Sequence, residues 1–165
     1  MRLRQPVDAD AVAVATAVQA SLAELLPWMP WASADYDEAM ALAWIRGETG
    51  DPYRFAIVDD DGVLVGTCGL NGVDELNRSA NLGYWVRTDR AGNGLATAAT
   101  RLVAEFGLRE AGYQRLEIKM STRNHASRRV AEKAGATHEG VARSSLLLHG
   151  EFHDAHVWSI LAGEI

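Results

Sequence analysis

Hydrophobic and polar positions repeat with two different periods along the chain, and the changes of period outline its elements. Residues 2–5 predict a short strand. An alanine- and valine-rich stretch follows Asp8 and Asp10 and runs to about Leu26. Acidic residues favour the first turn of a helix, so this stretch predicts a helix.

A second helix is predicted after a proline break. Pro27 and Pro30 end the first helix, because proline denies the helix a backbone donor. Asp35 with Glu38 three residues later resembles a capping arrangement. It predicts a helix that runs to about Gly47.

The middle of the chain has the pattern of antiparallel strands. Residues 53–58 are largely apolar, and the turn sequence Asp59-Asp60-Asp61-Gly62 follows them. Residues 63–70 then predict the returning strand, and 80–87 predict a third strand rich in aromatic and branched residues.

The last half of the chain alternates between the two periods. A helix is expected up to Gly112, because apolar residues recur at helical spacing at Leu95, Ala98, Ala99, Leu102 and Phe106. A strand over 115–120 follows, and then a helix that Asn124 opens and Gly135 closes. Two strands are expected over 142–148 and 152–161. Seven strands and four helices in this order predict a mixed α/β or α+β fold with a mainly antiparallel sheet.

Size and composition narrow the class of protein. The chain has 165 residues, of which 48% are hydrophobic, and this predicts a single domain over residues 1–165. No apolar run reaches a membrane-spanning length, and the start lacks the apolar core of a secretory signal. We expect a cytoplasmic protein with no membrane partner. The net charge of -6 and a pI near 5.3 do not favour nucleic acid.

Cysteine and histidine offer little chemistry. The single cysteine, Cys68, excludes an internal disulfide, and its strand context predicts a core residue rather than a nucleophile. On a strand, the spacing of His149, His153 and His156 places the third histidine on the opposite face from the first two. We therefore expect no metal site. His153 and Asp154 are interpreted as turn residues before the last strand, where they shape an acceptor site or serve only as polar turn residues.

A glycine loop between a strand and a helix is the strongest local signal. It has the sequence Gly92-Asn93-Gly94-Leu95-Ala96-Thr97. Glycine lets the backbone approach a ligand, and a helix N-terminus offers free N–H donors and partial positive charge. The pattern suits a pyrophosphate, although a plain turn explains it equally well. Neither the dinucleotide-binding fingerprint nor the P-loop sequence is present.

A second segment with chemical potential begins at Asn124. Asn124 and Ser127 lie on the first turn of the predicted helix, where they can hydrogen-bond an extended ligand that carries amide groups. Arg123, Arg128, Arg129 and Lys133 can then meet its phosphates. The alternative is an ordinary capped surface helix.

These segments, in this order, resemble the GNAT superfamily of N-acetyltransferases, closest to the RimJ/RimL-type branch that acetylates protein N-termini. The resemblance covers nearly the whole chain and is carried by Leu26-Pro27-Trp28-Met29-Pro30-Trp31, by Asn77 with Leu82-Gly83-Tyr84-Trp85-Val86, by Gly92-Asn93-Gly94-Leu95-Ala96-Thr97, and by Asn124-His125-Ala126-Ser127 with Val130-Ala131-Glu132-Lys133.

The resemblance implies a GNAT fold in which the two central strands splay apart and hold acetyl-CoA in the cleft. It assigns the pantetheine and thioester to backbone near Trp85, Val86 and Arg87, the pyrophosphate to the amides of Gly92, Asn93, Gly94, Leu95, Ala96 and Thr97, and the thiol end to Asn124 and Ser127. It also allows a homodimer.

Three departures from the family pattern affect the catalytic assignment. Ala91 stands where glutamine or arginine is frequent, so backbone, with Arg90 helping, must hold the phosphates. Ala131 stands at the position of a frequent tyrosine acid, which leaves Ser127 as the acid candidate.

Asn81 stands where a glutamate is common, so a general base must come from elsewhere. The candidates are Asp74 and Glu75, before the fourth strand, although a solvated turn explains them as well.

The expected acceptor is a primary amine, most of all a protein N-terminus. Direct attack needs a neutral amine, and an α-amine is neutral at pH 7 far more often than a lysine. Trp28, Trp31 and Tyr84 are the candidate acceptor contacts, with core packing as the alternative for the tryptophans. A small amine (an antibiotic, amino acid or polyamine) and a non-catalytic acyl-CoA-binding module remain open as other functions.

Overall fold

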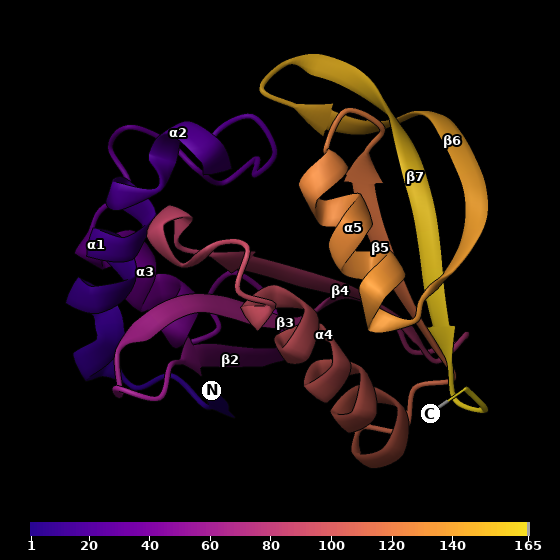
Figure 1. The fold of residues 1–165 in the computed structure, drawn as a ribbon, viewed down its shortest axis with the longest axis horizontal. Coiled ribbons are helices and arrows are strands. Elements are labelled where there is room, and N and C mark those ends of the chain that lie inside the picture. Colours follow the sequence, from indigo (N-terminus) through magenta and orange to yellow (C-terminus); the bar gives the residue numbers. More distant parts are fainter. Residues whose placement is uncertain (165) are drawn as a thin grey trace.

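The computed structural model describes residues 1–164, which form a seven-stranded sheet with helices on its two faces (Figure 1). The strands are β1 (Arg2–Arg4), β2 (Tyr53–Val58), β3 (Leu64–Asp74), β4 (Ser79–Val86), β5 (Arg115–Ser121), β6 (Thr137–Leu148) and β7 (Glu151–Leu161). Their order in the sheet is β1-β2-β3-β4-β5-β7-β6. Only the β4–β5 pair is parallel in this sheet, which confirms the predicted mainly antiparallel mixed sheet.

The helices number five in residues 1–164, one more than the sequence predicts. They are α1 (Ala11–Ala20), α2 (Leu22–Leu25), α3 (Glu38–Ile45), α4 (Leu95–Glu105) and α5 (His125–Ala134), and a π-helical turn, η3 (Phe106–Glu110), extends α4. The extra helix arises because Ser21, with ψ of 11°, interrupts the predicted first helix. The Ser21 hydroxyl is buried and accepts a hydrogen bond from the Thr88 N–H at 3.1 Å.

Helix ends follow local signals in most places. The Asn124 side chain accepts from the Ser127 N–H at 3.0 Å, and Gly135, with φ of +94°, closes α5 as predicted. The prediction for α3 was wrong by two residues. Asp37 caps this helix by accepting from the Met40 N–H at 2.9 Å, whereas Asp35 lies outside it.

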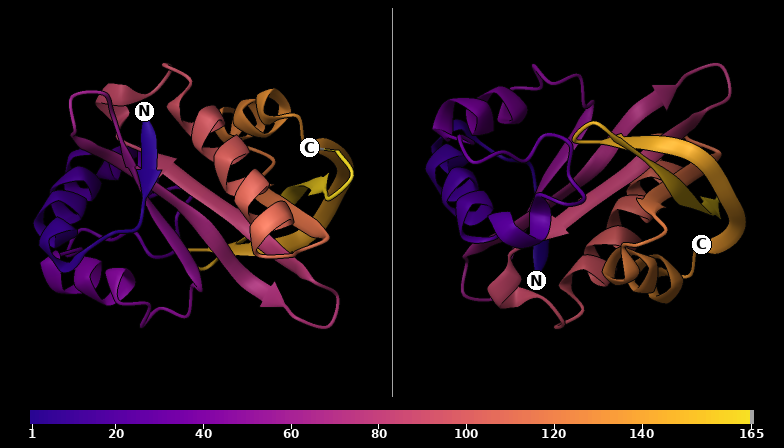
Figure 2. Two further views of the ribbon diagram at one scale, coloured as in Figure 1. Left: turned by 90° about the horizontal axis from the view of Figure 1, so that it is seen from below. Right: turned by 90° about the horizontal axis from the view of Figure 1, so that it is seen from above.

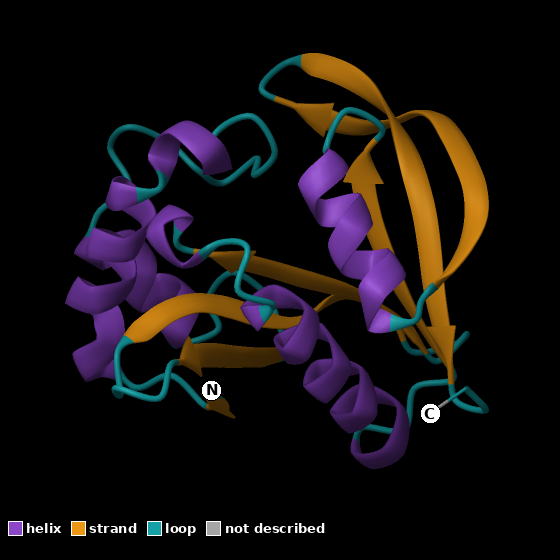
Figure 3. Cartoon of the chain, viewed as in Figure 1, coloured by secondary structure: helices purple, strands orange, loops and turns teal. Residues whose placement is uncertain are grey.

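The C-terminal hairpin is longer than predicted and strongly curved (Figure 3). Strand β6 begins at Thr137 rather than at 142, because a register shift between Ala142 and Leu146 breaks the alternation that marks a strand. His153 and Asp154 therefore lie inside β7, not in the turn before it. The expected turn at His149 and Gly150 is confirmed.

The two faces of the sheet carry separate cores. Helices α1–α3 cover one face of β2–β4, and α4 with α5 cover the opposite face (Figure 2). The two faces are named the α1–α3 face and the α4–α5 face below. Because side chains alternate along a strand, Trp85 packs on the α1–α3 face while Leu82 and Tyr84 pack on the other.

The central strands β4 and β5 pair over only three residues each. Ser79, Ala80 and Asn81 pair with Arg115, Leu116 and Glu117, respectively. Past this point the described strands diverge, which confirms the expected splay (Figure 1). Within residues 1–164, the helices all lack the length and apolar character needed to cross a membrane.

Candidate active site

A large cavity occupies the space where β4 and β5 diverge. Its volume is about 880 Å³, and its lining comes from β3, β4 and β5, the Trp28–Trp31 segment and the tip of the β6–β7 hairpin. Trp28, Trp31, Tyr84, Trp85, Asn124 and Ser127 all line it. The fold thus brings Trp28 and Ser127, which lie 99 positions apart in the sequence, to one cavity.

The glycine loop forms a cradle at the start of α4. Gly92 and Gly94 adopt φ of +82° and +78°, a region that other residues rarely enter. Gly94 is the N-cap and has no side chain to cap the helix. The first-turn N–H groups of Leu95, Ala96 and Thr97 therefore face outward with the positive end of the helix dipole. This arrangement fits a pyrophosphate.

The cations near this loop differ in what they contact. The Arg87 guanidinium pairs with Asp89 at 2.8 Å. The Arg90 Nε is buried and has no hydrogen-bond partner in the described chain. The Arg90 Nη2 lies 3.8 Å from an Asp59 carboxylate oxygen, and the phosphate-binding role of Arg90 stays a prediction.

Some backbone N–H and carbonyl groups of β4 hydrogen-bond to β3, and others face the gap between β4 and β5. The Arg87 N–H donates to the Val65 carbonyl at 2.8 Å, and its carbonyl accepts from the Arg90 N–H at 3.0 Å. In an antiparallel ladder alternate residues point their backbone groups the same way, so Trp85 also faces β3. The main-chain groups of Tyr84 and Val86 face the gap, where they can hold an extended ligand.

Two hydroxyl groups meet on the α4–α5 face of the gap. The Tyr84 hydroxyl lies 3.0 Å from Ser127 Oγ and donates to the Ser127 carbonyl at 3.1 Å. Burial raises the pKa of Tyr84 to about 12, although its hydrogen bond with Ser127 opposes this shift. The phenol is therefore a proton-bearing donor at neutral pH. Tyr84 lines the cavity with its hydroxyl beside Ser127, and its predicted contact with the acceptor stays a prediction. Ala131 is fully buried one turn after Ser127.

The α1–α3 face of the cavity is aromatic. Trp31 contacts Trp85 and Tyr36, with ring centroids 6.1 and 5.6 Å apart, respectively. The tip of the β6–β7 hairpin borders the cavity on this side, and there His149 Nε2 lies 3.2 Å from the Met29 carbonyl. The tryptophans thus both pack and line the cavity, so the two interpretations of them are compatible.

The predicted base candidates lie apart from the cavity. Asp74 and Glu75 are exposed in the β3–β4 hairpin, at the closed end of the β4–β5 gap, and neither lines the cavity. Hydrogen bonds from the Asn77 side chain and backbone lower the pKa of Asp74. A lowered pKa makes Asp74 a weaker base. The structure also leaves both carboxylates outside the cavity that Ser127 lines.

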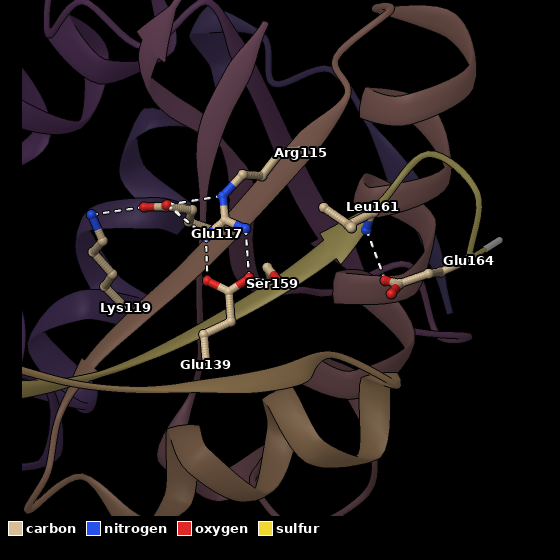
Figure 4. A network of polar contacts seen from close by, with 7 residues as sticks. All are labelled: Arg115, Glu117, Lys119, Glu139, Ser159, Leu161 and Glu164. Carbon is tan, nitrogen blue, oxygen red and sulfur yellow. Dashed lines mark hydrogen bonds and ion pairs between the residues drawn. The ribbon is translucent and has the colours of Figure 1, made fainter. Parts of the chain in front are cut away.

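Other polar side chains that the sequence analysis did not select reach the cavity. Glu117 and Lys119 line it from β5, and Figure 4 shows Glu117 bound by both Arg115 and Lys119. Burial acts to raise the pKa of Glu117, but hydrogen bonds from Lys119 and Arg115 outweigh it and lower the pKa. Asn81 donates to Asn71 at 2.9 Å on the same face. The polar positions of 115–119 alternate with apolar ones, and this was the available signal that they share a face.

A glycine-capped helix beside a gap between parallel strands, with a hydroxyl pair at the gap, fits an acyl-CoA-dependent transferase. Comparison with known proteins gives the family: residues 1–137 match the model described as "Acetyltransferase (GNAT) domain". The chain belongs to the GNAT acetyltransferase family. It is an N-acetyltransferase, and acetyl-CoA is its cosubstrate.

Three relatives illustrate the branch of the family. "Putative ribosomal N-acetyltransferase YdaF" of Bacillus subtilis is 32% identical over 169 residues, which cover 99% of this chain and 91% of the relative. The "Ribosomal-protein-serine acetyltransferase" of Escherichia coli is 26% identical over 68% of this chain and 62% of its own length. The structure of Mycobacterium smegmatis RimJ in complex with CoA-disulfide is 28% identical and superposes with a TM-score of 0.88, covering 99% of this chain and 82% of that one. These similarities confirm the RimJ/RimL-type resemblance.

Proposed function

We propose that this enzyme transfers the acetyl group of acetyl-CoA to the N-terminal α-amine of a protein, with a ribosomal protein as the acceptor. The observation that carries the proposal is the cavity of about 880 Å³ that reaches the β4–β5 gap from the α1–α3 face. A cavity of this size has room for the first residues of a polypeptide. The names of the Bacillus and Escherichia relatives support an acceptor of this kind.

The transfer takes place by direct attack in a ternary complex. Acetyl-CoA binds with its pyrophosphate on the first-turn amides of α4 and its thiol end beside Asn124 and Ser127. The amine arrives from the α1–α3 face, past Trp31 and Trp85, and its nitrogen forms a bond to the thioester carbonyl carbon. The carbon–sulfur bond breaks, and the Ser127 hydroxyl, backed by Tyr84, donates to the leaving sulfur.

The weak bases of the cavity favour an α-amine over a lysine. At pH 7 about 14% of an α-amine with a pKa of about 7.8 is neutral, against about 0.04% of a lysine with a pKa of about 10.4. The difference corresponds to about 3.5 kcal/mol. Glu117 lines the cavity with a lowered pKa, and Asp74 and Glu75 lie outside it, so none of these carboxylates is suited to deprotonating a lysine.

A panel of acceptors tests the proposal. Thiol release from acetyl-CoA is measured with a peptide that has a free α-amine and no lysine, with its N-blocked lysine-bearing counterpart, and with small amines. We expect the free α-amine peptide to react fastest. Equal rates for the two peptides would refute the preference for α-amines. Reaction with small amines alone would assign the enzyme to that substrate class, and binding of acetyl-CoA without any transfer would indicate a binding module.

A further inference from the structure

A chain of polar side chains leads away from the gap on the α1–α3 face, and the transfer described above does not use it. It consists of Ser121 at the end of β5, His153 and Glu151 on β7, and Arg123 just after β5. Ser121 Oγ lies 2.9 Å from His153 Nδ1. His153 Nε2 lies 3.8 Å from a carboxylate oxygen of Glu151, which Arg123 binds at 3.1 Å.

The position of Ser121 connects this chain to the reacting centre. Ser121 lines the cavity and belongs to the part of β5 that has diverged from β4. Its side chain shares a face with Glu117 and Lys119, since Ile118 and Met120 pack in the core of the α4–α5 face. Ser127 and Tyr84 thus approach the gap from one side, and Ser121 approaches it from the side at which the amine enters.

One tautomer of His153 lets the Ser121 hydroxyl donate to it. The Arg123 N–H donates to Ser121 Oγ at 3.3 Å, which occupies one lone pair. In the tautomer of His153 that carries its proton on Nε2, the Ser121 hydroxyl donates to Nδ1, and the second lone pair of Oγ is left for a donor from the cavity. In this tautomer the His153 Nε2–H points towards the Glu151 carboxylate.

We propose that Ser121 and His153 form a relay that removes the proton of the acceptor amine. This inference rests on the proposed function, because it needs an amine in the cavity. As the nitrogen–carbon bond forms, the proton of the amine passes to Ser121 Oγ while the proton of Ser121 passes to His153 Nδ1. Glu151 stabilises the resulting imidazolium, which returns its proton to solvent after the thiolate has left and been protonated.

The surroundings of His153 suit an imidazole that changes charge during turnover. Its side chain is 9% exposed, so its interactions are only weakly screened by water. The charged groups that the structure links to it are Glu151 on its own strand and, through Glu151, Arg123 after β5. On the other flank β6 presents Leu146, which is apolar.

The first test compares His153→Gln and Ser121→Ala with wild-type enzyme and a peptide acceptor. A general base contributes roughly 10²- to 10⁴-fold, and for a base that acts through a serine we expect the low end of this range, about 10²-fold in kcat/KM. We expect His153→Gln and Ser121→Ala each to lose about that factor in kcat/KM, and the double variant to be no slower than the slower single variant. Ser121→Thr, which keeps a hydroxyl, should have most of the wild-type activity. His138→Gln is the matched control, since His138 is an exposed histidine paired with His156 outside the cavity.

The dependence of kcat/KM on pH separates a relay from a structural role. It is measured with two peptides whose α-amines have different pKa values. In the pH profile of the wild-type enzyme, we expect one ionisation to shift with the pKa of the acceptor amine and a second to be the same for both peptides. The second ionisation should be absent from the profile of His153→Gln. A variant whose rate falls by one factor at every pH, or does not fall, would overturn the relay.

Two measurements keep the relay distinct from the proposed function. Calorimetric binding of acetyl-CoA should be unchanged in His153→Gln, because His153 lies on the acceptor side of the gap. If the wild-type enzyme acetylates only small amines, the proposed acceptor fails while the relay is tested with that amine. Full activity of His153→Gln on that amine would then refute the relay alone.

Discussion

Replacing Ser127 with alanine removes one of the two hydroxyls that meet on the α4–α5 face of the gap. A donor to the developing charge of the transition state is worth 10²- to 10³-fold in kcat, or about 2.7–4 kcal/mol. We therefore expect Ser127→Ala to lose at least about 10²-fold in kcat. Its free energy of unfolding should fall by only about 1 kcal/mol, because the Tyr84 hydroxyl keeps its bond to the Ser127 carbonyl at 3.1 Å.

A double-mutant cycle with Tyr84→Phe shows whether the tyrosine acts through the serine. If it does, Tyr84→Phe costs roughly 10-fold and the double variant is no slower than Ser127→Ala. Because burial raises the pKa of Tyr84 to about 12, its contribution should be constant from about pH 6 to 10. Thiol release gives kcat, and calorimetry gives the affinity for acetyl-CoA. A Ser127→Ala enzyme within threefold of wild-type turnover, or a double variant that loses the product of both factors, would refute this reasoning.

Three further substitutions test packing, pH dependence and the cysteine. Gly66→Ala places a Cβ 2.2 Å from the backbone carbonyl oxygen of Trp85, so urea unfolding should show a loss of about 2–3 kcal/mol; a loss below about 1 kcal/mol would contradict this contact. The Arg4 hydrogen bonds lower the pKa of Asp10, so their stabilisation is complete above the unfolded pKa of about 4 and is lost as the pH falls below it. Asp10→Asn should reduce stability by roughly 1–2 kcal/mol at pH 7 and have less effect near pH 2. Burial raises the pKa of the Cys68 thiol, so Cys68→Ala should leave turnover nearly intact, and loss of turnover in a folded variant would revive the nucleophile.

The sequence predicted those parts of the fold that depend on local chemistry. The cap at Asn124, the closing Gly135 and the glycine loop before α4 are set by a few neighbouring residues, and all three lie where they were expected. Seven strands were also recognised by their periods. The split of the first helix at Ser21 was missed because its cause is a hydrogen bond to Thr88, 67 positions away.

The site was harder to predict because its contacts are long-range. The Tyr84–Ser127 pair joins residues 43 positions apart, and the Ser121–His153 pair joins residues 32 positions apart. Asp74 was selected for its closeness to β4 in sequence, but the hairpin carries it away from the cavity. The roles assigned to the cofactor- and acceptor-binding residues stay predictions, as do the homodimer and the cytoplasmic location.

The short pairing between β4 and β5 has a mechanical consequence. Within the sheet, three paired residues on each strand join the β1–β4 part to the β5–β7 part. Beyond these pairs, the facing edges of β4 and β5 do not pair with each other, which leaves backbone groups for a ligand. A cosubstrate whose amide groups hydrogen-bond to both β4 and β5 adds reversible contacts between the two parts of the sheet. Because a ligand that binds the folded state stabilises it, saturating acetyl-CoA should raise the resistance of the chain to proteolysis.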